Sequence, residues 1–162
     1  MAGQNGKITR RTPTPEKMWE ELTVRSHRLS GRGRYPEAIE CAEEALRIAK
    51  QNDAPDYPIV WWTLYELGNV YQAQAVEFKG QRRLVKSNEA FASAERCYKK
   101  ALKMCKQAKG RKRSEAVYET LAKLTCLEAN QGNHEKADRI FTSGATVALT
   151  AMGVIKARRS DK

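Results

Sequence analysis

The sequence has 162 residues, a mass of 18.3 kDa and a formal net charge of +11. This length suits a single domain, which buries roughly two-thirds of the surface of its unfolded chain. The sequence has no apolar run of transmembrane length, and its first thirty residues lack the apolar centre of a secretory signal. We therefore expect a cytoplasmic protein, with an organelle lumen reached through a basic transit peptide as the minor alternative.

Residues suited to catalysis or metal binding are few. The four cysteines lack C-x-x-C spacing and a neighbouring His pair, so we expect reduced thiols, mostly in the core. His27 and His134 are the only histidines, and no Gly-rich phosphate loop occurs. We predict a non-enzymatic protein without a metal, a cofactor or a small-molecule substrate.

The first third of the chain predicts a tail and two helices. Residues 1–13 are polar and lack periodicity, which is typical of a disordered tail. Thr14 is a suitable N-cap for a first helix, and Pro15 suits its first position. Pro36 opens a second helix with one small apolar face and one acidic face.

The middle third predicts two longer helices. A loop rich in Pro and Asp, residues 52–58, precedes a third helix, which nothing interrupts before Gly80. Residues 79–86 then form an inserted connection, with Ser87 or Asn88 as the cap of the fourth helix.

The last third predicts two further helices. The fourth helix ends near Lys109, and the fifth extends from about Ser114 to Gln131. Asn133 caps the sixth helix, whose second half, residues 144–155, is apolar on nearly every side. We divide the chain into a basic tail, a helical domain with three repeats and a basic end: residues 1–13, then 14–157 (about 15–52, 58–109 and 114–157), then 158–162.

One stretch of the third helix carries a recognisable pattern. Leu64, Leu67, Gly68 and Tyr71 follow L-x2-L-G-x2-Y spacing, which places them on one side of a helix. Glycine costs about 1 kcal/mol relative to alanine inside a helix, so Gly68 predicts the close approach of a second helix. That second helix contains Ala94-x3-Tyr98-x2-Ala101.

Together these segments resemble the tetratricopeptide repeat. Two more copies look similar, with second halves that begin at Gly33 and at Gly132, and the alignment places Trp19, Trp61 and Tyr118 at equivalent starts. The first two copies start 42 residues apart, from Trp19 to Trp61, so the resemblance is to divergent, long-period members. It implies an all-α fold of three antiparallel helix pairs, stacked as a short right-handed solenoid with a long central hairpin.

In this family the first helix of each pair lines a concave groove, which implies a peptide-binding site here. The alternative is that Trp62 and Tyr65 simply pack on the adjacent repeat. Only Asn69 and Lys123 match parts of the carboxylate clamp of cochaperone members, so that clamp is not predicted. The groove residues implied by the resemblance are Glu20, Thr23, His27, Trp62, Tyr65, Asn69, Gln72, Glu119, Ala122, Lys123 and Cys126.

The positive charge is concentrated in residues 79–113, which hold 13 Lys or Arg against two acids. One interpretation is a solvated outer face; the others are contact with RNA, with an acidic protein, or with the acidic second helix of another copy. The basic residues of this stretch are Lys79, Arg82, Arg83, Lys86, Arg96, Lys99, Lys100, Lys103, Lys106, Lys109, Arg111, Lys112 and Arg113.

The apolar end of the sixth helix is either covered by the amino-terminal segment or forms an interface. The candidate interface residues are Val147, Leu149, Met152, Val154 and Ile155. We predict an adaptor or chaperone-like subunit that binds a protein segment in the groove and assembles, with itself or a partner, through its last helix. The alternative is a basic subunit of a ribonucleoprotein or other large complex.

Overall fold

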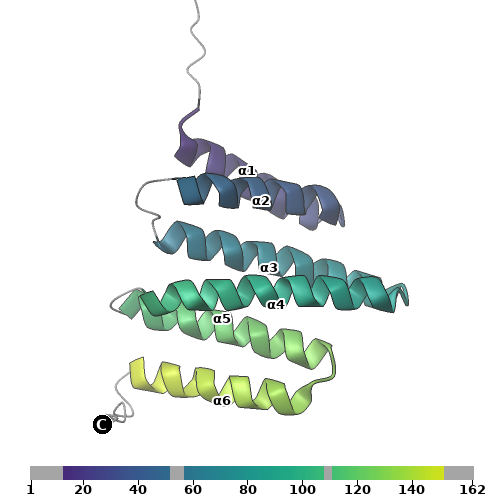
Figure 1. The fold of residues 1–162 in the computed structure, drawn as a ribbon, viewed down its shortest axis with the longest axis vertical. Coiled ribbons are helices and arrows are strands. Elements are labelled where there is room, and N and C mark those ends of the chain that lie inside the picture. The colour runs from purple at the N-terminus through teal and green to yellow at the C-terminus, as the bar shows by residue number, and fades with distance from the viewer. Residues whose placement is uncertain (1–12, 52–56, 108–110, 152–162) are drawn as a thin grey trace, which may run out of the picture.

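The computed structural model describes residues 13–51, 57–107 and 111–151 (Figure 1). Within them the chain is all-α, and the helices pack pairwise in chain order, α1 with α2, α3 with α4 and α5 with α6. The pairs are stacked through α2 on α3 and α4 on α5. The predicted fold class of three helix pairs is confirmed. The helices are α1 Pro15–Ser30, α2 Tyr35–Gln51, α3 Tyr57–Gly80, α4 Leu84–Gln107, α5 Arg111–Asn130 and α6 His134–Ala151.

The helix ends follow local chemistry at most of the expected places. The Thr14 hydroxyl accepts a hydrogen bond from the Lys17 amide at 3.4 Å, and Pro15 occupies the first turn of α1, as predicted. Gly33 and Gly132 have φ angles of 72° and 84° in the turns of the first and third pairs. This left-handed conformation is easily adopted by glycine, which explains the two helix stops. The predicted end of the fourth helix near Lys109 lies outside the described residues.

The fourth helix begins earlier than the sequence predicts. We expected Ser87 or Asn88 to cap it, but α4 begins at Leu84 and Ser87 is buried. The Ser87 hydroxyl instead donates to the carbonyl oxygen of Ala75 on α3 at 2.8 Å. The tight turn is made at Arg82, whose φ of 58° is unusual for a residue with a side chain.

The central pair is longer because the insertion is helical, not a connecting loop. α3 and α4 have 24 residues each, against 16 in α1 and 17 in α2. The same backbone hydrogen bond closes all three turns, from the amides of Arg34, Arg83 and Asn133 to the carbonyls of Leu29, Phe78 and Glu128. Relative to the first pair, the extra residues therefore add about two turns to each central helix. The α3–α4 hairpin consequently extends beyond its neighbours at one side of the stack (Figure 1).

A repeated pair of hydrogen bonds connects successive repeats. The Trp19 indole donates to the Thr63 hydroxyl at 2.8 Å, and the Trp61 indole donates to the Thr120 hydroxyl at 3.0 Å. Each threonine in turn donates to a carbonyl four residues earlier in its own helix, at 2.7 Å. Trp19 and Trp61 make equivalent hydrogen bonds to the next repeat. The two positions that the sequence alignment makes equivalent are therefore also equivalent in the stack of repeats.

The glycine of the motif lies where two helices meet. A Cβ atom on Gly68 would be 2.6 Å from Cε1 of Tyr98, whose side chain is fully buried on α4. The predicted close approach at Gly68 is therefore confirmed, and its partner is an aromatic ring. Cys41, Cys97 and Cys105 are buried, and Cys126 is exposed.

Candidate binding groove

The groove is built around the buried Tyr98. Its hydroxyl oxygen lies 2.9 Å from an amide oxygen of Asn69 and 2.9 Å from that of Gln72, both on α3. One hydroxyl has a single proton to donate, so it donates to one amide and accepts from the NH2 of the other, rotated amide. The two amides therefore present opposite polarity, one free NH2 and one free carbonyl. Burial raises the pKa of Tyr98 well above its usual value, so the phenol stays protonated.

An open depression of about 500 Å³ lies beside these amides, between α3 and α5. Four of the expected groove residues line it together, although they come from distant parts of the sequence: Asn69, Gln72, Lys123 and Cys126. Three other lining residues were missed: Tyr35, Ala73 and Val76. Ala73 and Val76 continue the helical stripe of Asn69, so periodicity could have found them. Tyr35 enters from the start of α2, which only the tertiary structure reveals.

An aromatic ledge adjoins the depression on α3. The rings of Trp62 and Tyr65 stack with centroids 5.7 Å apart, and Trp62 remains 37 % exposed. The Lys123 ammonium lies 5.7 Å from the centroid of Tyr65, a cation–π contact between α5 and α3. Burial, with the nearby carboxylates of Glu119 and Glu66, raises the pKa of Tyr65 to about 12. Tyr65 therefore packs between α3 and α5, and it is not among the residues that line the depression.

The expected residues of α1 are arranged differently from those of α3 and α5. The His27 ring contacts the buried carboxylate of Glu66 at 3.0 Å, and the Thr23 hydroxyl donates to the Trp19 carbonyl. Neither residue lines the depression, and Glu20 is exposed to solvent beyond them. The remaining α5 residues, Glu119 and Ala122, are exposed beside the ledge.

The basic residues divide into paired and unpaired groups. Lys79 donates to the Asn130 carbonyl at 2.5 Å, Arg83 lies over the Phe78 ring, and Arg96 donates to the Ser93 hydroxyl. Lys99 pairs with Glu95 at 2.8 Å. Within the described residues, no ion pair is recorded for the exposed cations Arg82, Lys86, Lys100 and Lys103. Lys109 lies outside the described residues, and the side chains of Lys106, Arg111, Lys112 and Arg113 are not described.

The candidate interface on the last helix is described only in part. Leu149 is partly exposed, and Phe141 on the same helix, which was not among the candidate interface residues, is 60 % exposed. The side chain of Val147 is not described, and Met152, Val154 and Ile155 lie outside the described residues. The described part of α6 therefore exposes two large apolar side chains, Phe141 and Leu149.

The described residues offer neither a metal-binding cluster nor a membrane-spanning helix. Among the described residues, no group of three or more His, Cys, Asp or Glu side chains could hold a metal ion. No helix in the described part of the chain is long and apolar enough to span a membrane.

The chain is similar to one known protein family over part of its length. The sequence model of the tetratricopeptide repeat matches residues 29–75, which span α2 and most of α3. The recognition made from the sequence pattern is confirmed over these residues. Repeats of this kind are generally protein–protein interaction modules and are typically non-catalytic. No curated protein and no solved structure matches the chain.

Proposed function

Because residues 29–75 carry a tetratricopeptide repeat, we propose that this protein is a non-enzymatic adaptor or chaperone-like subunit that binds a protein segment between α3 and α5. It joins a larger assembly, or a second copy of itself, through the exposed apolar side of α6. The partner segment is extended or helical, because the groove combines an aromatic ledge with amide groups.

The observation that carries this proposal is the depression of about 500 Å³ with its aromatic ledge. Trp62 offers an exposed ring for apolar contact, and aromatic side chains of this kind often dominate binding energy. Asn69 and Gln72 offer one donor and one acceptor, held in place by Tyr98, which suits the alternating polarity of a peptide backbone. Lys123 adds a cation at the edge.

The test is quantitative affinity capture from the native source, with nuclease and then high salt. A double variant, Trp62→Ala with Lys123→Ala, should lower the amount of captured partner about 30-fold, the effect of losing a hot-spot contact of about 2 kcal/mol. Its matched control, Val85→Ala with Lys103→Ala, removes an exposed apolar side chain and a cation from α4 and should leave capture unchanged. Circular dichroism checks that both variants stay folded. Equal capture by the groove variant and the wild type would refute the groove.

A second function is favoured by the unpaired cations Arg82, Lys86, Lys100 and Lys103. These side chains are free to contact phosphate groups, because none is neutralised by a described carboxylate. In this case the protein is a basic subunit of a ribonucleoprotein or other large complex. The same capture experiment separates the two functions. Loss of the captured proteins on nuclease treatment, together with a reduced yield for the control carrying Lys103→Ala, would support the second function over the first.

A further inference from the structure

A buried charge occupies an apolar position of the third repeat. The Glu128 side chain on α5 is 1 % exposed. Its backbone carbonyl closes the α5–α6 turn in the same way that Leu29 and Phe78 close the first two turns. The first two repeats therefore place an apolar side chain where the third places a carboxylate. A buried carboxylate is stable only when its negative charge is neutralised, so Glu128 needs a positively charged partner.

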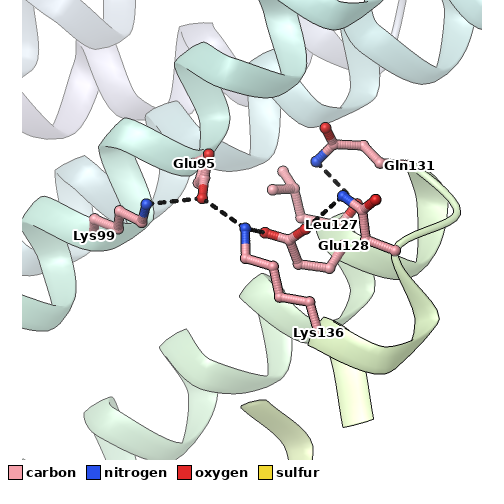
Figure 2. A network of polar contacts seen from close by, with 7 residues as sticks. Glu95, Lys99, Leu127, Glu128, Gln131 and Lys136 are labelled. Atoms are coloured by element: carbon pink, nitrogen blue, oxygen red, sulfur yellow. Dashed lines mark hydrogen bonds and ion pairs between the residues drawn. The ribbon is translucent and has the colours of Figure 1, made fainter. Parts of the chain in front are cut away.

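That partner is Lys136, in the first turn of α6 (Figure 2). Its ammonium contacts Oε1 of Glu128 and lies 3.2 Å from Oε1 of Glu95 on α4. The other Glu128 oxygen accepts a hydrogen bond from the Asn133 side chain at 2.9 Å. Figure 2 shows Lys136 between the two carboxylates, so one lysine connects α4, α5 and α6.

The charge on Lys136 matters most for Glu128. Glu95 has a second cation, since the Lys99 ammonium lies 2.8 Å away, and it is partly exposed to water. Glu128 has no second cation among its recorded contacts and is closed off from water. Removing one member of a buried ion pair is strongly destabilising, because the other charge is left uncompensated.

α6 is the element that would respond. Among the described helices its backbone packs against α5 alone, whereas α3 and α5 have neighbours on two sides. Its contacts with α5 include Ile140 against the cluster of Leu124 and Leu127, and Gly144 against Leu121. A terminal helix with one neighbour opens at lower free energy than the central pairs.

We propose that Lys136 is a charge-controlled latch of the third repeat, and that acylation of this lysine releases α6 from α5. The Lys136 side chain is about half exposed, so it is accessible to a modifying enzyme. In the reaction the neutral amine attacks the carbonyl carbon of an acyl thioester. The N–C bond forms, the C–S bond breaks, the thiolate leaves and the nitrogen loses a proton. The product amide is uncharged and cannot compensate Glu128.

The same contacts make the closed latch slow to react. The hydrogen bond to Glu128, with the neighbouring carboxylate of Glu95, raises the pKa of Lys136 and keeps it as an unreactive ammonium. Opening of α6 removes these contacts and increases the fraction of free amine. Acylation therefore occurs in the open form and prevents it from closing.

Amide hydrogen exchange, read helix by helix, tests the latch. Lys136→Gln and a chain with Nε-acetyl-lysine at position 136 should both exchange at least tenfold faster in residues 134–151, with α1 to α3 unchanged. Lys136→Arg keeps the charge and should exchange like the wild type. Lys99→Gln is the matched control, because it removes the other lysine at Glu95 and leaves Glu128 compensated.

A second comparison isolates the buried carboxylate. Glu128→Leu restores the residue type of the first repeat, so adding Lys136→Gln to it should no longer accelerate exchange of α6. The latch is refuted if Lys136→Gln leaves α6 protected, or if it accelerates exchange equally in every helix. Faster exchange in the double variant than in Glu128→Leu alone also refutes it. Wild-type protection in the acetylated chain would refute release by acylation.

Discussion

At the scale of single residues, the contact between Gly68 and Tyr98 determines how α3 meets α4. The glycine lets the tyrosine ring lie directly on the helix backbone, and the ring in turn positions two groove amides through its hydroxyl. One buried aromatic side chain thus couples core packing to the candidate binding surface. The L-x2-L-G-x2-Y pattern identified the glycine, but only the structure identified what it accommodates.

Replacing Gly68 by alanine should therefore destabilise the protein. The new Cβ would be 2.6 Å from a fully buried ring that is held by two hydrogen bonds, and overpacking of this kind costs about 1–3 kcal/mol. The better helix propensity of alanine offsets about 1 kcal/mol of that loss. Gly80→Ala is the matched control, because no atom lies within 4 Å of its added Cβ. Urea unfolding should show a lower midpoint for Gly68→Ala only, and equal midpoints would contradict this account.

At the scale of helices, the two ends of the central hairpin are placed differently relative to the first repeat. Its open end aligns with the first repeat through Trp19 and Trp61, which make equivalent bonds to the next repeat. Its closed end lies farther out, because each helix has gained about two turns. Seven residues turn a helix by nearly a whole number of turns, with a drift of only about 20°. The lengthened helices can therefore keep the same faces together.

This periodicity predicts that the extension can be removed. Deletion of residues 76–89, with Ala75→Gly and Ala90→Asn to reproduce the Gly132-Asn133 turn of the third repeat, removes seven residues from each side of the hairpin. The shortened chain should fold with cooperative, lower-temperature unfolding, because buried contacts are lost but the helix faces stay aligned. A ten-residue deletion centred on the same turn rotates each helix by about 500° and should not give a cooperative transition. Calorimetry would contradict the interpretation if the two deletions behaved alike.

At the scale of the whole molecule, stability depends on several buried groups that must remain protonated. Burial raises the pKa of the Cys97 thiol to about 11 and that of Tyr71 to about 12, and it raises the pKa of Tyr98 further. Each of these groups binds its proton more tightly in the folded chain than in the unfolded chain. Their stabilising contribution is therefore complete below the ordinary values of about 8.5 for Cys and 10 for Tyr, and it is lost at higher pH.

The free energy of unfolding should consequently begin to fall near pH 9, before Tyr71 ionises in the folded chain. At the acid end, the hydrogen bond from Lys99 lowers the pKa of Glu95, so its contribution is present above about pH 4.5 and is lost as the pH falls. Urea midpoints measured from pH 4 to pH 11 should form a plateau between these limits. Tyr98→Phe should weaken the alkaline decline, and an unchanged decline would contradict the role of this phenol.

The sequence by itself determined the helices, their pairing and the repeat. Helical periodicity and cap chemistry are local, so Thr14, Gly33 and Gly132 mark their boundaries without knowledge of the fold. The stripe from Trp62 to Gln72 on α3 is also local, and it supplied part of the candidate groove.

The tertiary structure decided the features that depend on contacts between distant residues. Ser87 looks like a helix cap in the sequence, but its bond to Ala75 places it inside α4, so the insertion became helix. The entry of Tyr35 into the groove and the hydroxyl of Tyr98 beneath it likewise depend on how the pairs stack. Glu128 reads as an ordinary surface residue until the turn buries it beside Lys136. Burial and long-range hydrogen bonds are properties of the folded arrangement, and local sequence patterns do not encode them.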